Sequence, residues 1–274
     1  MTTPPDEAPA SRQARRRAHA RARAIRAARA AALVVVLAAG GAGVWALLRD
    51  DGHSEARVEP STSSTTTTSA PAFEPFVTAT SNVPEITAYD APADTAGVVE
   101  TFSQATEYLA PRTFLVVEQQ PGWLHVLLPM RPNGSAGWIR ESEVTLGETE
   151  YEIRVELSTT KVTLLEAGEV VLETQSGIGR DNTPTPVGEY YVTDPVDLTD
   201  RPNGAYGAYA LGISGYSEVL MEFNGGPGQI AIHGTANPAD AGQKVSNGCI
   251  RVTNDVIFRI AAEVPIGTPL TIVA

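Results

Sequence analysis

Residues His233–Val252 read HGTANPADAGQKVSNGCIRV, and this stretch decides how the second half of the chain is interpreted. It holds Cys249, the single cysteine among 274 residues, sixteen positions after His233. A strand ending at His233 can present the imidazole at a sheet edge, and the following loop can bring Cys249 back to it. Gly248 permits a close backbone approach beside the sulphur. The spacing alone leaves two interpretations open: a nucleophile with its base, or an ordinary buried thiol near an unrelated histidine.

The first interpretation makes definite chemical demands. A cysteine nucleophile reacts as its thiolate, so a nearby base or local dipoles must lower the pKa of Cys249. His233 is the candidate base, and the backbone N–H groups of Gly248 and Cys249 are the candidate donors to a developing oxyanion. A third group must orient the imidazole. The segment contains no acid besides Asp240, so a backbone carbonyl is a reasonable candidate.

Composition excludes several other classes of function. One cysteine rules out an internal disulfide, and no cluster of cysteines and histidines has zinc-ligand spacing, so we expect neither a metal nor a cofactor. The net charge is −12, yet residues 1–50 contain nine arginines and only three acids. The remaining residues are therefore strongly acidic, which argues against nucleic-acid binding by the main body of the protein.

The N-terminal part is predicted to anchor the chain in a membrane. Residues 30–48 are uncharged and mostly apolar, and as a helix this segment is long enough to span a bilayer. The arginines before this segment predict a cytoplasmic tail at 1–29 and an extracytoplasmic remainder, a single-pass protein of the cell membrane. A cleaved signal peptide and a buried core helix are the alternatives. Residues 49–78, rich in serine, threonine and proline, are expected to form a disordered stalk.

Two β-rich modules are expected to follow the stalk. Residues 79–147 contain short alternating strands and a turn at Pro121-Gly122. The Gly-Trp pairs in Gly122–Val126 and Gly137–Ile139 resemble those of bacterial SH3-type barrels, which implies contact with cell-wall material or packing on a catalytic neighbour. Core packing is the simpler role of both tryptophans.

Residues 150–274 contain further short strands, including predicted ones at 218–223 and 229–234, and a hairpin turn at Glu166–Gly168. One helix is expected, with Asn254 as its N-cap and Pro265 beyond its end. Its apolar stripe is formed by Val256, Ile257, Ile260, Ala261 and Val264. The predicted fold class is therefore mainly β: a transmembrane helix and stalk, a small SH3-like barrel, and a β-rich domain with a short helix.

Two motifs in this last block resemble the L,D-transpeptidase catalytic-domain family (YkuD-like). His233-Gly234-Thr235, a loop, and Ser246–Arg251 match the family's H-G-[TS] and S-[HN]-G-C-[IV]-[RN] signature. Ser176–Val192 resembles the family's upstream segment with a Thr-Pro pair and a following glycine. Many members have histidine before the Gly-Cys pair, whereas this chain has Asn247, which weakens any role for a second imidazole.

The resemblance implies acyl transfer on peptidoglycan stem peptides without a cofactor. Cys249 would attack the carbonyl of the third residue of a donor tetrapeptide, with His233 as base and then acid. The Gly234 carbonyl would orient the imidazole, and a thioester would pass to the amine of a second stem, giving a 3→3 cross-link. The resemblance also implies acylation of the cysteine by carbapenems.

Other roles stay open at this stage. The substrate-binding candidates are Ser246, Asn247, Arg251, Thr235 and Tyr209. Arg251 pairs with a stem carboxylate or forms a structural salt bridge. Ser246 and Asn247 bind substrate or shape the turn. Tyr206 and Tyr209 line the site or pack against neighbouring side chains. The acyl-enzyme could also pass to water, as in an L,D-carboxypeptidase, or to a protein amine. A non-catalytic wall-binding protein is the alternative from a different class.

Overall fold

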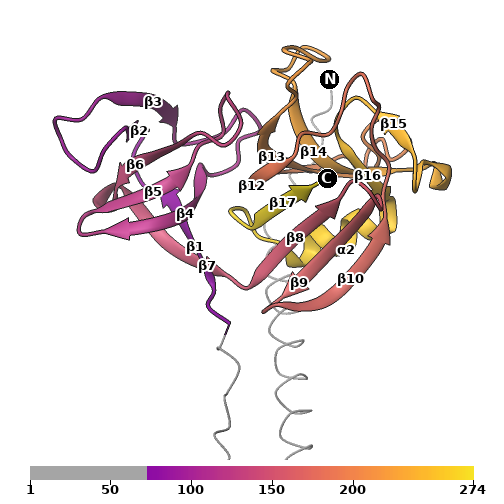
Figure 1. The fold of residues 1–274 in the computed structure, drawn as a ribbon, viewed down its shortest axis with the longest axis horizontal. Coiled ribbons are helices and arrows are strands. Elements are labelled where there is room, and N and C mark those ends of the chain that lie inside the picture. The colour runs from indigo at the N-terminus through magenta and orange to yellow at the C-terminus, as the bar shows by residue number, and fades with distance from the viewer. Residues whose placement is uncertain (1–72) are drawn as a thin grey trace, which may run out of the picture. The chain divides into compact units, whose positions relative to one another are not determined.

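The computed structural model describes residues 73–274, which form two β-sheet modules (Figure 1). The predicted cytoplasmic tail 1–29, the membrane segment 30–48 and nearly all of the stalk 49–78 lie outside the described residues. Within residues 73–274, no helix combines the length and apolar character needed to cross a membrane. For this part of the chain, the predicted mainly β fold class is confirmed.

The first module is one antiparallel sheet with the strand order β3-β2-β6-β5-β4-β1-β7. Its strands are β1 (Phe76–Ser81), β2 (Glu85–Tyr89), β3 (Val98–Ser103), β4 (Thr113–Gln120), β5 (Trp123–Leu127), β6 (Ala136–Arg140) and β7 (Val144–Thr149). The predicted turn at Pro121-Gly122 is confirmed: it joins β4 to β5, and Gly122 has a φ of +79°. The first strand begins at Phe76, inside the range assigned to the stalk, because Phe76 packs against the core of this module.

Both tryptophans of the first module pack against neighbouring side chains. Trp138 is buried and stacks on His125 at 4.7 Å between ring centroids. Trp123 meets Tyr89 edge to face at 5.7 Å. These contacts agree with the packing role, whereas the resemblance to an SH3-type barrel stays a prediction.

The second module is built on a mixed sheet with the order β10-β9-β8-β17-β12-β13-β14-β16. Its elements are β8 (Tyr151–Glu156), β9 (Lys161–Glu166), β10 (Glu169–Gln175), β12 (Gly188–Asp197), β13 (Tyr209–Tyr216), β14 (Gln229–Thr235), β16 (Ile250–Thr253), α2 (Asn254–Glu263) and β17 (Pro269–Val273). A small parallel pair, β11 (Ile178–Gly179) and β15 (Lys244–Ser246), lies outside that sheet. The hairpin turn at Glu166–Gly168 is confirmed, with φ values of +51° at Ala167 and +80° at Gly168.

Helix α2 covers β13, β14 and β16 and encloses the core of this module (Figure 1). In the predicted apolar stripe, Ile257, Ile260 and Val264 are buried, and Val256 and Ala261 are partly buried against the same core. The assignment of Asn254 as N-cap is wrong: Thr253 precedes the helix and Asn254 is its first residue. The Asn254 side chain is used elsewhere, since its Oδ1 accepts from the Ala208 N–H at 2.9 Å and its Nδ2 donates to the Pro202 carbonyl at 3.2 Å.

The predicted strand at 218–223 is also wrong. This segment is part of the loop between β13 and β14, and Phe223 forms only an isolated bridge with Gly226. Val219 and Met221 are 53% and 61% exposed, so the apolar composition that favoured a strand does not reflect burial in a sheet.

Candidate active site

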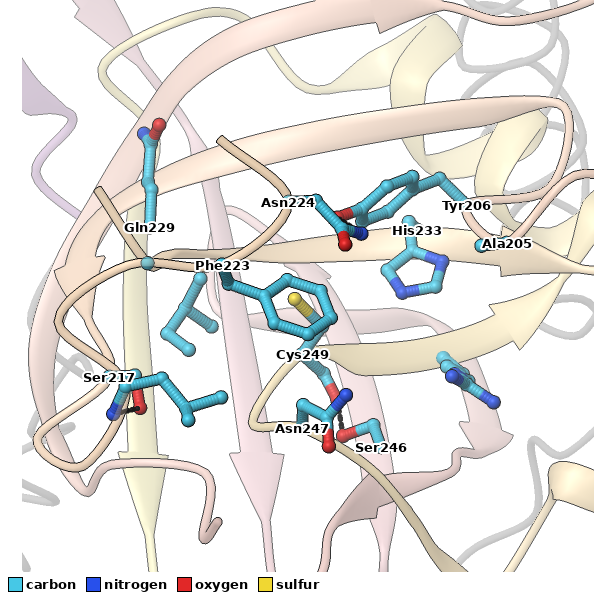
Figure 2. Close-up of a pocket in the computed structure, with 14 residues that line it drawn as sticks. Ala205, Tyr206, Ser217, Phe223, Asn224, Gln229, His233, Ser246, Asn247 and Cys249 are labelled. Atoms are coloured by element: carbon cyan, nitrogen blue, oxygen red, sulfur yellow. Dashed lines mark hydrogen bonds between the residues drawn. The ribbon is translucent and has the colours of Figure 1, made fainter. Parts of the chain in front are cut away.

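The pairing of β14 with β16 brings His233 and Cys249 together. The two strands are parallel, with Ile232 opposite Ile250 and His233 opposite Arg251. Ile232 and Ile250 are buried in the core, so alternation along the strands directs His233 and Cys249 to the other face. Both side chains line one pocket, and Figure 2 shows the sulphur and the imidazole among its lining residues. The predicted return of Cys249 to the histidine is therefore confirmed.

A backbone carbonyl fixes the orientation of the imidazole. His233 Nδ1 lies 2.8 Å from the Gly234 carbonyl oxygen, the contact that the family resemblance implies. Because a carbonyl oxygen only accepts, Nδ1 carries the proton and Nε2 keeps its lone pair. The Tyr206 ring meets the imidazole edge-on, with 5.1 Å between centroids and an angle of 70°. The ring is thus held as a base with one defined tautomer.

Two glycines permit the close packing behind the Gly234 carbonyl. Gly207 has a φ of +61°, and an added Cβ there would overlap the Gly234 carbonyl group. An added Cβ on Gly234 itself would overlap Asn254 Oδ1. Since Asn254 also binds the backbone at Ala208, the loop before β13 and the first turn of α2 are tied together around this carbonyl.

Burial acts on both reacting groups and favours their neutral forms. Burial lowers the pKa of His233 to about 4, with Arg251 acting in the same direction against hydrogen bonds to the Gly234 and Tyr206 backbone. Burial raises the pKa of the Cys249 thiol, against the smaller effects of the Ala231 backbone and Arg251. The expected lowering of the Cys249 pKa is therefore not found in this state. Thiol and neutral imidazole are the resting forms at pH 7.

The turn before Cys249 is closed by Ser246. Its Oγ donates to the Cys249 carbonyl at 2.6 Å and accepts from the Gly248 N–H at 3.1 Å. Gly248 has a φ of +118°, and an added Cβ would come within 2.9 Å of Ile230. Because the Gly248 N–H already has an acceptor, this geometry does not support its predicted part in an oxyanion hole. Ser246 shapes the turn, one of its two predicted roles.

Asp240 organises the other polar candidates. Its Oδ2 lies 3.2 Å from Arg251 Nη1 and accepts from Thr235 Oγ1 at 3.0 Å. Arg251 thus forms the structural salt bridge that the sequence left open, and it is also one of the residues that line the pocket. Thr235 is not among the residues that line the pocket. Asn247 lines it, and its Oδ1 accepts from Arg180 Nη1 at 3.0 Å.

The two tyrosine candidates have different positions. Tyr206 lines the pocket beside His233. Tyr209 lies in β13, packs on the core under α2, and has its ring 6.1 Å from that of Phe258. It is not among the lining residues of the pockets around Cys249 in the described part of the chain. The substrate-binding role predicted for Tyr209 is therefore not supported by its position.

Sequence reasoning missed the loop between β13 and β14. Leu220, Phe223 and Asn224 from this loop line the pocket that contains Cys249. Figure 2 shows Phe223 and Asn224 on its border. The segment was interpreted as a strand, so no local signal marked it as part of the site. No group of three histidine, cysteine or acidic side chains suited to a metal ion occurs within residues 73–274.

Comparison with known proteins agrees with the architecture of this site. Residues 150–272 match the L,D-transpeptidase catalytic domain, YkuD. This part of the chain is therefore a YkuD-like L,D-transpeptidase catalytic domain, as its motifs predict. The YkuD proteins of Bacillus subtilis and Bacillus licheniformis are each 34% identical to it over 122 residues. The match covers 44% of this chain and 65% of each relative, slightly less than two thirds of their length.

Solved structures give a weaker likeness. An L,D-transpeptidase from Mycobacterium tuberculosis is 19% identical, with a TM-score of 0.39, over 53% of this chain and 75% of that one.

Proposed function

We propose that this protein is a peptidoglycan L,D-transpeptidase that forms 3→3 cross-links through an acyl-enzyme on Cys249. The observation that carries the proposal is the placement of His233 and Cys249 on one face of adjacent parallel strands, lining one pocket, with the imidazole held by the Gly234 carbonyl. A thiol, an oriented base and a pocket are the parts that cysteine acyl transfer requires.

Acylation begins when the Cys249 sulphur attacks the carbonyl carbon of the donor's third residue while its proton passes to His233 Nε2. The tetrahedral intermediate collapses, the C–N bond to the terminal D-Ala breaks, and His233 returns the proton to the leaving amine. A thioester remains on Cys249. Because both groups are neutral at rest, the ion pair forms only during the reaction, when each charge stabilises the other.

Transfer completes the cycle. The neutral side-chain amine of a second stem attacks the thioester, His233 takes its proton, and the thiolate leaves and is reprotonated. The product is an amide between two third residues. The backbone N–H of Cys249 remains the candidate donor to the oxyanion. The thioester retains the energy of the cleaved bond, so the reaction requires neither ATP nor metal.

The first test is intact mass spectrometry of the full chain incubated with a carbapenem. We expect one adduct per chain, lost in Cys249→Ala and strongly slowed in His233→Gln. His125→Gln is the matched control, because that histidine stacks on Trp138 in the other module. Absence of an adduct on folded wild-type protein would contradict the proposal and favour a non-catalytic wall-binding protein.

A second assay identifies the acceptor. The full chain is incubated with a donor tetrapeptide alone, or with a second stem that carries a free side-chain amine, and the products are resolved by mass. A cross-linked dimer supports transpeptidation. Release of tripeptide alone indicates an L,D-carboxypeptidase, and transfer only to a protein amine indicates attachment of proteins to the wall.

The proposed location follows from the substrate. Residues 30–48 would cross the bacterial membrane, with 1–29 in the cytoplasm and the catalytic domain on the cell-wall side. Protease added to intact spheroplasts should then digest the catalytic domain and spare the N-terminal tail. Protection of the catalytic domain would contradict this topology.

A further inference from the structure

A row of four residues crosses the sheet from the nucleophile to a buried acid. Asp194 in β12 pairs with Gly212 in β13, and Gly212 pairs with Ala231 in β14. The pairing of Ile232 with Ile250 places Ala231 beside Cys249, just before β16. All four line one pocket that opens on Cys249. Paired residues share a face, so the small residues Gly212 and Ala231 leave a trough between Cys249 and Asp194. Gln229 narrows the Asp194 end of this trough, because its Nε2 would lie 3.1 Å from a Cβ added to Gly212.

The Asp194 carboxylate is incompletely satisfied in this trough. The residue is 3% exposed, and its Oδ2 accepts from Gln229 Nε2 at 3.2 Å. Its Oδ1 is buried and has no hydrogen-bond partner. Gln229 Nε2 also donates to Thr193 Oγ1 and to the Ile213 carbonyl, so it is shared among three acceptors. A buried carboxylate oxygen without a partner is costly, so a hydrogen-bond donor on a ligand would stabilise it.

The nearby cations are engaged elsewhere. Arg201 lines the outer part of the pocket with a side chain 71% exposed, and its Nε lies 3.9 Å from Asp200. Arg112 and Asp194 both line an adjoining pocket, where Arg112 Nε donates to the Ser103 carbonyl at 3.2 Å and the guanidinium lies over the Phe102 ring. Tyr108 of the first module also lines the pocket, and its pKa is raised by burial and then by Asp194. The site therefore offers negative charge to a ligand.

We propose that Asp194 binds the side-chain ammonium of the donor stem's third residue, a diamino acid, while the carbonyl of that residue lies at Cys249. This inference rests on the proposed function. It makes Asp194 a specificity-determining residue, at the opposite end of the trough from the reacting atoms. The ligand class is a primary ammonium on a side chain of lysine-like length.

The length of the trough fits this substrate. Three strand spacings separate Asp194 from Cys249, about 14 Å between their Cα atoms. A lysine-like residue spans roughly 7 Å from its carbonyl carbon to its terminal nitrogen. The Cys249 and Asp194 side chains, with a thioester bond and a hydrogen bond, fill the rest. The attacking amine of the acceptor must touch the thioester carbon, so the ammonium at Asp194 belongs to the donor.

The test compares two donor tetrapeptides that differ only in the third side chain, with a free amine or an acetylated one. The acylation rate of Cys249 in the full chain is followed by intact mass. In the wild type we expect the free amine to be preferred about tenfold or more, the effect of one charge-assisted hydrogen bond. Asp194→Asn should reduce this preference to about one, mainly by slowing the free-amine donor.

Asp197→Asn is the matched control, since it removes the same charge from an exposed position of the same strand. It should keep the wild-type preference. The midpoint of thermal unfolding separates a binding role of Asp194 from a structural one. Because Asp194→Asn removes an unsatisfied buried charge, we expect its midpoint to stay unchanged or to rise.

Equal rates for both donors in the wild type would overturn this inference and leave the proposed function intact. The inference would also be overturned, with the proposed function intact, if Asp194→Asn kept the preference for the free-amine donor. The same holds if Asp194→Asn slowed acylation by both donors equally. Failure of both donors to acylate Cys249 in folded wild-type protein would overturn the proposed function, and this inference with it.

Discussion

The guanidinium of Arg131 lies 4.8 Å from the ring centroid of Tyr216 and joins the first module to the loop that lines the active-site pocket. Arg131 Nη2 donates to the Ser217 carbonyl at 3.0 Å and to the Leu220 carbonyl at 3.2 Å. Asn133 reinforces this contact by exchanging two hydrogen bonds with the Tyr216 backbone, at 2.8 and 2.9 Å. The first module therefore holds the start of the loop that carries Phe223 to Cys249.

Arg131→Ala should loosen this loop. Loss of two hydrogen bonds and a cation–π contact is expected to lower the free energy of unfolding by about 2 kcal/mol. Acylation by a carbapenem should slow, because Leu220 and Phe223 no longer have a fixed position. Arg154→Ala is the control, as that side chain is 60% exposed and pairs with Glu152 on the surface. Unchanged acylation in Arg131→Ala would mean that the clamp has no influence on the site.

The resting state of Cys249 is predicted to be the thiol. Since burial raises its pKa, thiolate absorbance near 240 nm should be absent at pH 7 and should appear only above about pH 8.5, the range of an ordinary thiol. Cys249→Ser provides the baseline for the difference spectrum. A step in absorbance below pH 7 would instead indicate a thiolate–imidazolium pair at rest.

The low pKa of His233 predicts a defined loss of stability in acid. The unfolded histidine titrates near 6.5 and the folded one at about 4, so the unfolded state binds more protons between these values. Stability should therefore be fully present above about pH 6.5 and fall as the pH drops to about 4. At pH 4 the resulting loss in the free energy of unfolding amounts to about 3 kcal/mol.

Urea unfolding of wild type and His233→Gln at pH 7 and pH 4 measures this effect. The wild type should lose about 3 kcal/mol more than the variant, because the carboxylates that titrate in this range are common to both. Identical pH dependence in wild type and His233→Gln would show that the buried imidazole does not resist protonation.

Gly207→Ala tests the backbone packing behind the imidazole. The left-handed φ of Gly207 and the overlap of a Cβ with the Gly234 carbonyl predict a loss of about 2 kcal/mol or more. Carbapenem acylation should fall as well, since displacing this carbonyl disturbs the His233 tautomer and orientation. Gly204→Ala in the same loop is the control, because its φ is not left-handed and an added Cβ would make a tight contact of 3.1 Å with the Arg201 carbonyl oxygen without overlapping it. Equal stability and equal carbapenem acylation in Gly207→Ala and Gly204→Ala would contradict the prediction.

Local sequence patterns predicted those features that neighbouring residues decide by themselves. The turns at Gly122 and Gly168 need a left-handed backbone that glycine adopts without strain, and both occur where expected. The stripe of Ile257, Ile260 and Val264 follows the helical period and is buried. The motif residues His233 and Cys249 were recognisable because their types and spacing are chemically restrictive.

Local patterns failed where distant contacts decide the outcome. Asn254 has the usual type for an N-cap, yet its side chain binds the backbone at Ala208 and Pro202. Residues 218–223 have strand-like composition but form a loop that contacts the first module through Arg131. The raised pKa of Cys249 likewise depends on burial, which no short segment specifies.

The sequence by itself therefore determined the chemical inventory: one cysteine, one histidine before a glycine, the turns, and the apolar helix stripe. Tertiary structure decided the geometry, because strand register is set by packing between residues far apart in the chain. Only that register places His233 beside Cys249, and only the row through Gly212 and Ala231 connects Cys249 with the buried Asp194.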